Sequence, residues 1–217
     1  MFKYYIICKQ DIEAKLTMLA DLCGVIYYSD SANISTMELD DLLPYLTQKY
    51  HGWLLEQRSL HLRSARQLSR EEQSSLHEYF DDKIIDSARI AVVEHISNPA
   101  FYSELTELGI SNPLDFTQSA GITLINCILI CKYYESSPLT WLSILFHELV
   151  HVVQYDILGS KKLVELYVAG WAQNGYQYHD IPFERQAYEL EGRFNRGGSP
   201  FSVRQFVKQE LEREANG

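Results

Sequence analysis

The sequence predicts an α+β fold in which a small β-sheet packs against several helices. Two short runs rich in β-branched residues, 89–93 and 122–130, have the composition of strands. The segment 139–158 has the length of a helix and is apolar nearly all round, which is typical of a helix buried at the centre of a domain. The 217 residues are 46% hydrophobic and 22% charged, so we expect one folded domain with an extension.

Residues 1–84 are expected to form a mainly helical N-terminal extension. Its role is open, because a lid, a pro-segment and a region that docks a partner would each suit a polar, helical segment. The signals are amphipathic spacing, a proline and one capping box. They predict a helix over 11–22, a strand over 25–28, a helix over 37–50 that Pro44 bends or shifts, and a helix that Ser69 and Glu72 open and that ends near residue 80.

Residues 85–217 contain the predicted sheet and the central helix. Ser137 and Pro138 are suited to open the helix over 139–158, and Gly159 is suited to end it. Turns are expected at Asn98–Pro99 and Asn112–Pro113. Three further helices are expected over 161–173, from a cap at Asp180 to 195, and from a Ser202–Gln205 capping box to 212.

The formal net charge is −10, from 29 acidic and 19 basic residues, which disfavours nucleic acid as a partner. The N-terminal apolar run is too short for a signal peptide, and no apolar stretch is long enough to cross a membrane. We therefore expect a cytoplasmic protein without membrane contact, with secretion without a leader as an alternative. The cysteines have no C-x-x-C spacing and are expected to be ordinary thiols; they are Cys8, Cys23, Cys127 and Cys131.

The predicted central helix contains the motif His147-Glu148-Leu149-Val150-His151. Side chains four residues apart lie on one face of a helix, so both imidazoles are able to reach one metal ion. Glu148 lies about 100° around the helix from His147, where it can contact a water on that ion without ligating the ion. Burying three polar groups in an apolar helix is costly unless they are satisfied, and a metal satisfies them. The alternative is a pair of core histidines hydrogen-bonded to backbone or carboxylate groups.

A catalytic zinc needs a third protein ligand and one open position. The metzincin pattern would place Gly and His where this chain has Gln154 and Ile157, so that class is excluded. We expect the third ligand to be Glu184, in the first turn of its helix, facing the central helix across the small Ala187. The alternative role of Glu184 is a first-turn carboxylate that favours the helix dipole. The rival carboxylates are Glu165, Glu189 and Glu191.

Several segments carry a resemblance to a known family. They are FHELVHVVQY at 146–155, YVAGW at 167–171 and IPFERQAY at 181–188, with NPAFY at 98–102 and AGIT at 120–123. On these motifs, residues 80–205 resemble a family of uncharacterised bacterial zincin-like proteins and, more broadly, the minimal gluzincins. The resemblance implies a zincin-like domain over 85–217, in which an active-site helix and a glutamate helix pack under a small sheet.

The second motif of gluzincins often reads Glu-x-x-Ala-Asp, and here Glu184 and Ala187 match while Tyr188 replaces the aspartate. The resemblance implies Glu184 as a zinc ligand. It also implies an edge strand that pairs with substrate, for which 122–130 is the candidate, with a plain core strand as the alternative. The residues that would support a histidine ligand are Tyr188, Gln154 or Asp180. The candidates that would stabilise the transition state are Tyr176, Tyr178 and His179.

The residues and the resemblance together predict a zinc-dependent metallopeptidase of the gluzincin type. His147, His151 and Glu184 would bind Zn²⁺, and Glu148 would be the general base for the zinc-bound water that attacks a peptide bond. The expected partner is a peptide or protein substrate, and the sequence does not determine the oligomeric state. Three alternatives stay open: a catalytically silent zincin scaffold that binds a partner, a secreted effector protease, and a purely structural metal site.

Overall fold

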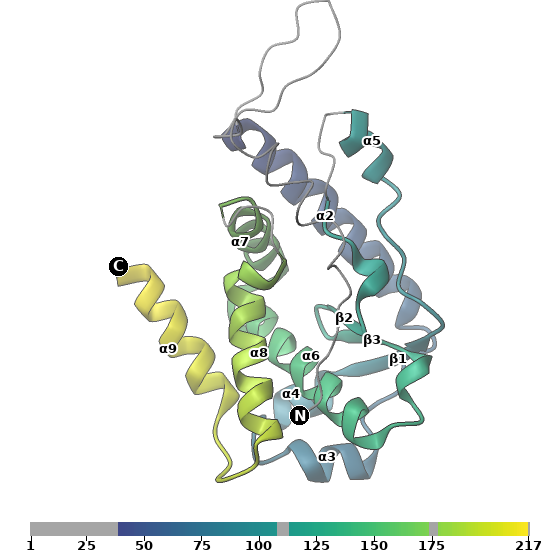
Figure 1. Cartoon of the computed structure of the whole chain (residues 1–217), viewed down its shortest axis with the longest axis vertical. Coiled ribbons are helices and arrows are strands. Elements are labelled where there is room, and N and C mark those ends of the chain that lie inside the picture. The colour runs from purple at the N-terminus through teal and green to yellow at the C-terminus, as the bar shows by residue number, and fades with distance from the viewer. Residues whose placement is uncertain (1–38, 108–112, 174–177, 217) are drawn as a thin grey trace, which may run out of the picture.

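A computed structural model describes residues 39–107, 113–173 and 178–216, and it shows a mainly helical α+β fold around a small sheet (Figure 1). The helix predicted over 11–22 and the strand predicted over 25–28 lie outside the described residues. Among the helices that are described, none is both long enough and apolar enough to cross a membrane.

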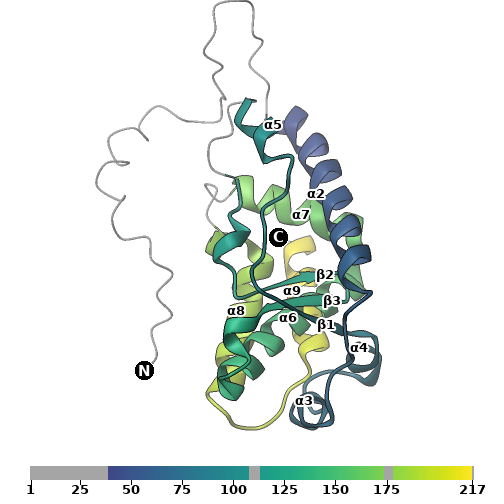
Figure 2. The ribbon, with the colours of Figure 1, turned by 90° about the vertical axis from the view of Figure 1, so that its right-hand side faces the viewer.

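The sheet has three strands, which lie side by side in Figure 2. β1 (Arg89–Val93) is parallel to β3 (Cys127–Cys131), and β2 (Gly121–Leu124) is antiparallel to β3. The order β1-β3-β2 places β2 at one edge of the sheet. The strand predicted over 89–93 is confirmed with the same bounds.

The single strand predicted over 122–130 is wrong, because the chain turns in its middle to form a hairpin of β2 and β3. Ile125 and Asn126 form the turn, and Ile125 has the positive φ, 65°, that two-residue hairpin turns require. An aliphatic residue at this position hides the turn in the sequence. The Asn126 side chain holds the turn by donating to Ser87 O at 2.7 Å and accepting from Arg58 Nε at 2.9 Å.

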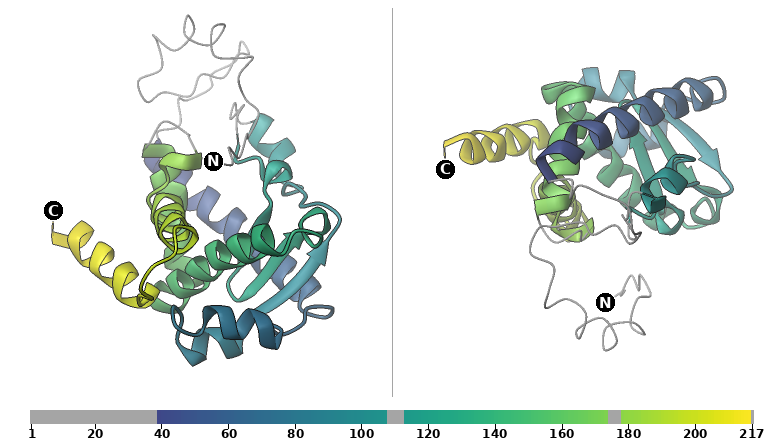
Figure 3. Two further views of the ribbon diagram at one scale, coloured as in Figure 1. Left: turned by 60° about the horizontal axis from the view of Figure 1, so that its bottom comes forward. Right: turned by 90° about the horizontal axis from the view of Figure 1, so that it is seen from above.

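The sheet lies between two long helices, α2 (Leu39–His61) and α6 (Pro138–Leu158). Side chains alternate along the strands, so one face of the sheet joins the apolar cluster around most of α6 and the other joins the cluster around α2. Figure 3 shows α2 running beside the strands and beside α7 (Ser160–Gln173). The part of the extension that is described is therefore built into the core.

The N-terminal helices differ in detail from the prediction. α2 continues to His61 instead of ending near residue 50, with Pro44 close to its start. The predicted capping box is present and opens α3 (Arg70–Leu76). Two short helices were not predicted, α4 (Asp82–Ser87), which Asp81 caps, and α5 (Tyr102–Glu107). The boundary expected between residues 84 and 85 falls inside α4.

The C-terminal helices follow the predicted order. α6 has Pro138 in its first turn and ends at Gly159, whose φ is 77°. α8 (Pro182–Asn195) and α9 (Val203–Asn216) complete the fold. Asp180 does not cap α8: the cap position is Ile181, because Pro182 takes the first helical position, where no backbone N–H is needed. Single 3-10 turns cover Phe116–Gln118, Lys132–Tyr134 and Tyr178–Asp180.

Candidate metal centre

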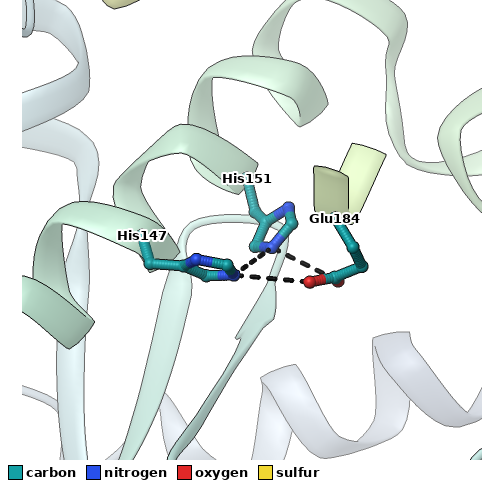
Figure 4. Close-up of side chains that lie close together, drawn as sticks. All are labelled: His147, His151 and Glu184. Atoms are coloured by element: carbon teal, nitrogen blue, oxygen red, sulfur yellow. Dashed lines mark hydrogen bonds and ion pairs between the residues drawn. The ribbon is translucent and has the colours of Figure 1, made fainter. Parts of the chain in front are cut away.

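Helix α6 carries His147, Glu148 and His151 into the interior, where their exposed fractions are 7%, 5% and 7%. The two histidines are one turn apart, and their rings lie on the same side of the helix with centroids 4.9 Å apart (Figure 4). Glu184 reaches the same point from the first turn of α8 and is 2% exposed. Two helices from separate parts of the chain thus enclose a polar group inside an apolar core.

Small residues allow α8 to approach its neighbours closely. Ala187, one turn beyond Glu184, is fully buried in the cluster around α6, as the sequence predicted. On α7, a Cβ atom added to Gly170 would lie 2.8 Å from Cδ of Pro182, so this contact has room only for glycine. The turn that carries Glu184 is therefore held between α6 and α7.

The facing atoms have the spacing of ligands around a tetrahedral ion. Nε2 of His147 lies 3.2 Å from Nε2 of His151 and 3.3 Å from Oε2 of Glu184, and Nε2 of His151 lies 3.4 Å from Oε1 of Glu184. Tetrahedral zinc bonds of about 2.0–2.1 Å place ligand atoms roughly 3.3 Å apart. Charge-assisted N–H···O bonds are shorter, about 2.7–2.9 Å. The three side chains could therefore hold a metal ion.

The second nitrogen of each ring faces an acceptor. Nδ1 of His147 lies 3.2 Å from Oε2 of Glu191, and Nδ1 of His151 lies 2.8 Å from Oε1 of Gln154. The amide of Gln154 is oriented by its Nε2, which donates to Phe183 O at 3.2 Å. Because both acceptors call for an N–H on Nδ1, each neutral ring presents the lone pair of its Nε2 to the centre of the site.

Protons satisfy this arrangement poorly. With neutral rings, two lone pairs 3.2 Å apart face each other beside a carboxylate; with both rings protonated, two N–H groups face each other. With one ring protonated, a single Nε2 proton is shared between the other ring and the Glu184 carboxylate. Oε2 of Glu184 is buried and has no hydrogen-bond partner among the described residues, which is a costly state for a carboxylate oxygen. One cation between the three side chains removes both conflicts, so the donor set fits a metal.

The charges around the centre favour a cation for the same reason. Burial lowers the pKa of His147, but Glu184 and Glu191 raise it more strongly, to about 10. Burial also lowers the pKa of His151, but Glu184 raises it more strongly, so the pKa of His151 is raised as well. Burial raises the pKa of Glu184, yet the two histidines bring it well below its ordinary value. The site therefore stabilises positive charge at its centre.

Glu148 is positioned by the edge strand β2. Thr123 Oγ1 donates to Oε2 of Glu148 at 2.7 Å. A Cβ atom at position 121 would lie 2.8 Å from Oε1 of Glu148, so the carboxylate keeps its place only beside Gly121. Burial raises the pKa of Glu148, as suits a group that exchanges protons near neutral pH. Gly121 and Thr123 were not predicted as parts of the site, because contacts between a strand and a later helix leave no local pattern in the sequence.

Two tyrosines link the loop before α8 to the metal centre. Tyr167 on α7 donates to Oε1 of Glu184 at 2.8 Å, and Tyr178 donates a hydrogen bond to Tyr167. Tyr178 was predicted as a site residue and Tyr167 was not, although Tyr167 opens the segment 167–171 that contributes to the family resemblance. His179 is exposed, with its ring 5.5 Å from that of Tyr178. Tyr176 lies outside the described residues.

The other candidates fall into different places. Of the residues expected to support a histidine, Gln154 contacts His151, and Tyr188 lies beside the His147 ring with 4.5 Å between centroids and a tilt of 57° between planes. Asp180 is exposed. Glu191, expected as a rival ligand, contacts His147 from behind, through Nδ1. The two remaining rivals are exposed on the surface; they are Glu165 and Glu189.

Comparison of the chain with protein-family models, with curated proteins and with solved structures found no match. A buried group of two histidines from one helix and a glutamate from a later helix is consistent with a zincin-like site, and it suggests an activity that depends on a metal.

Proposed function

We propose that the protein is a zinc-dependent hydrolase that cleaves peptide bonds. The observation that carries this proposal is the convergence of two Nε2 atoms and one carboxylate at 3.2–3.4 Å, with both Nδ1 atoms already engaged elsewhere. Two imidazoles and one carboxylate form a ligand set that suits zinc and leaves a position for substrate or water. Metal binding alone would not require the acidic Glu148 beside the ligands.

The residues that would hold the ion are His147, His151 and Glu184. When bound, zinc supplies a Lewis acid that lowers the pKa of a coordinated water and polarises a carbonyl. Glu191 and Gln154 keep the imidazoles in the tautomer that binds a metal, and Tyr167 orients the carboxylate of Glu184.

Glu148 is the proposed general base. Its carboxylate lines the same cavity as His151 and Glu184, and Thr123 orients one of its oxygens. It would take the proton of the attacking water and deliver that proton to the leaving amine. The raised pKa of Glu148 helps it to hold the proton between the two transfers.

The substrate is proposed to pair with the outer edge of β2, which no other strand of the described residues covers. Cys131 N donates to Ala120 O at 2.9 Å, so the backbone groups of Ala120 point toward β3. By alternation, Ile122 and Leu124 also direct their backbone groups to β3, and Gly121 and Thr123 direct theirs outward. An extended peptide could add to this edge by backbone hydrogen bonds, directly above Glu148.

The remaining requirement is a donor for the developing oxyanion. Tyr178 and His179, on the turn before α8, are the proposed candidates. Tyr178 lines the cavity beside the metal centre, and His179 is exposed next to it. Either side chain would act by a hydrogen bond that forms as the carbonyl oxygen gains charge.

The proposal is tested by metal analysis and by digestion of a peptide library. The purified chain should carry about one zinc, as a single three-ligand site requires. His147→Ala should lose the zinc, whereas Glu148→Gln should keep the zinc and lose hydrolysis. Hydrolysis by Glu148→Gln at the rate of the parent would remove the assignment of the base.

A second candidate function is a zinc-containing binding module without turnover. It is favoured by the hydrogen bond of Tyr178 to Tyr167, which in turn donates to Glu184. This bond occupies the hydroxyl of one of the two candidate oxyanion donors. The same experiment separates the two functions. A chain that holds zinc and cleaves no member of a broad peptide library supports the binding module.

A further inference from the structure

A cavity opens beside the metal centre, between α2, β2 and α7. Glu148, His151 and Glu184 line one end of it. The space free of atoms is about 700 Å³ when the open mouth of the cavity is included. The centre of a water molecule can occupy about 80 Å³ of it. A single water needs roughly 10–15 Å³ by that measure, so the closed part has room for one side chain and not for a large ligand.

Most of the remaining wall is apolar, and its polar members are Ser119, Thr123 and the tyrosines. Tyr50 and Trp53 come from α2, and Val164 from α7. The ring of Trp53 stacks on Phe116 with 5.2 Å between centroids and 13° between planes, and the edge of Tyr50 meets the same Phe116 ring at 6.5 Å. Stacked and edge-on aromatic pairs hold each other in place. The N-terminal helix α2 thus shapes one side of the cavity.

The charges in the wall restrict the guest further. Among the described residues that line the cavity, none is a lysine or an arginine, and the carboxylates are Glu148 and Glu184. Beyond the polar end, where the proposed zinc ion and the two carboxylates lie, a guest carboxylate would find no lysine or arginine of the described wall to pair with. A guest ammonium in that part of the cavity would lose its water against mainly aromatic and aliphatic walls, with no carboxylate of the described wall beside it. An uncharged, apolar group is the guest that such a wall accepts.

We propose that this cavity receives a large aliphatic or aromatic side chain next to the scissile peptide bond. This inference rests on the proposed function and deepens it, since it names the class of peptide that the site takes. Its basis is continuity: the polar end of the cavity is the metal centre and Glu148, so a side chain in the apolar part belongs to a residue adjacent to the reacting carbonyl. Burial of a leucine or phenylalanine side chain strengthens binding by roughly tenfold to a hundredfold.

The test measures binding of phosphinic peptides to the zinc-loaded chain by calorimetry. A phosphinic group replaces the scissile bond, and one side chain, before or after it, is varied among Gly, Leu, Phe, Asp and Lys. We expect Leu or Phe at one of the two positions to bind at least about tenfold more tightly than Gly, and Asp and Lys to bind no better than Gly. Equal affinities for Gly, Leu and Phe at both positions would overturn the proposal, as would a preference for Asp or Lys.

Two substitutions connect the selectivity to the cavity. Val164→Phe should fill it and bring the Leu-to-Gly affinity ratio close to one, with zinc content unchanged. Leu166→Phe is the matched control, because Leu166 lies on the same helix outside the cavity wall, and it should keep the ratio. Trp53→Ala covers the case in which Val164→Phe does not fold; it should weaken the Leu peptide by about tenfold and leave the Gly peptide unchanged. An unchanged ratio in every folded variant would refute the location.

The outcomes separate this inference from the proposed function. A zinc-loaded chain that selects apolar side chains but cleaves nothing keeps the cavity assignment and removes the hydrolase. A chain whose cleavage depends on Glu148 but which binds every phosphinic peptide equally keeps the hydrolase and removes the cavity assignment.

Discussion

The candidate metal ligands are oriented by residues that lie behind them. Glu191 accepts from His147 Nδ1, and it is itself held by Ser143, whose hydroxyl donates to Oε1 of Glu191 at 2.6 Å. Asn195 donates in turn to that hydroxyl at 2.7 Å. This chain of hydrogen bonds orients one imidazole without touching the centre of the site.

We predict that Glu191→Ala weakens zinc binding by about 10- to 100-fold, because His147 loses the acceptor that keeps its ring in the metal-binding tautomer. Competition with a chromophoric chelator measures the affinity. Glu189→Ala is the control, since Glu189 is exposed on the same helix and should keep the parent affinity. Equal affinities of the two variants would show that Glu191 does not support the ligand.

At position 121 the decisive property is the lack of a side chain. We predict that Gly121→Ala displaces the Glu148 carboxylate and lowers kcat by about 100-fold, the lower range for loss of a general base, with zinc content unchanged. Steady-state kinetics and metal analysis on the same sample check this. Gly52→Ala serves as the control, because no atom lies within 4 Å of an added Cβ on that α2 residue. A Gly121→Ala variant with the activity of the parent would show that Glu148 tolerates the displacement.

Among the secondary-structure elements, α3 is connected by one carboxylate to α6, the helix that carries both candidate histidine ligands. Glu72 accepts from both Nη atoms of Arg66 at 2.7 and 2.8 Å, from Ser69 N at 2.6 Å and from Trp141 Nε1 of α6 at 2.7 Å. Burial raises the pKa of Glu72, but these donors together lower it by more, so the pKa lies below the ordinary value of 4.5. The carboxylate form is therefore the one that the fold stabilises.

A lowered pKa in the folded state means that stability is present above pH 4.5 and is lost as the pH falls through the folded pKa. We predict that Glu72→Gln lowers the free energy of unfolding by about 1.5–3 kcal/mol at pH 7. The difference from the parent should shrink as the pH falls through the folded pKa of Glu72, because the parent carboxylate then becomes protonated. Urea unfolding at a series of pH values from 7 downward measures it, with the exposed Glu78→Gln as control. A difference that stays constant with pH would contradict the role of the charge.

For the molecule as a whole, the candidate metal centre joins two parts of the chain. His147 and His151 lie on α6, beneath the sheet, and Glu184 lies on α8, which packs on α6 and meets α7. An ion that binds only the folded chain stabilises it in proportion to the logarithm of its concentration over Kd. The ion would therefore act as a cross-link between the α6–sheet unit and the C-terminal helices.

We predict that chelation of the metal lowers the Tm. At a free zinc concentration 1,000 times Kd the linkage amounts to about 4 kcal/mol, which in a chain of this size corresponds to roughly 10 °C. Differential scanning fluorimetry with and without EDTA measures the shift. The response should vanish in His147→Ala and persist in His77→Ala, whose imidazole is exposed. A parent Tm that is insensitive to EDTA after verified removal of zinc would exclude a stabilising ion.

Local patterns were enough to predict β1, α6 and the capping box of α3. The spacing that puts His147 and His151 on one face of α6 follows from the helical period alone, so it was readable without the fold. The same reasoning failed at Ile125–Asn126, where a β-branched residue stands in a turn that usually contains glycine. It failed again at Asp180, because the proline at 182 sets where α8 begins.

The sequence by itself determined which residue types were available for a metal site and narrowed the third ligand to four carboxylates. Only the tertiary structure decided that Glu184 meets both imidazoles, that Glu191 lies behind one of them, and that Glu165 and Glu189 face outward. The physical reason is that a helix's rotation about its axis, and its distance from a neighbour, follow from packing at residues such as Ala187 and Gly170. Such contacts join positions far apart in the chain, so no local period reports them.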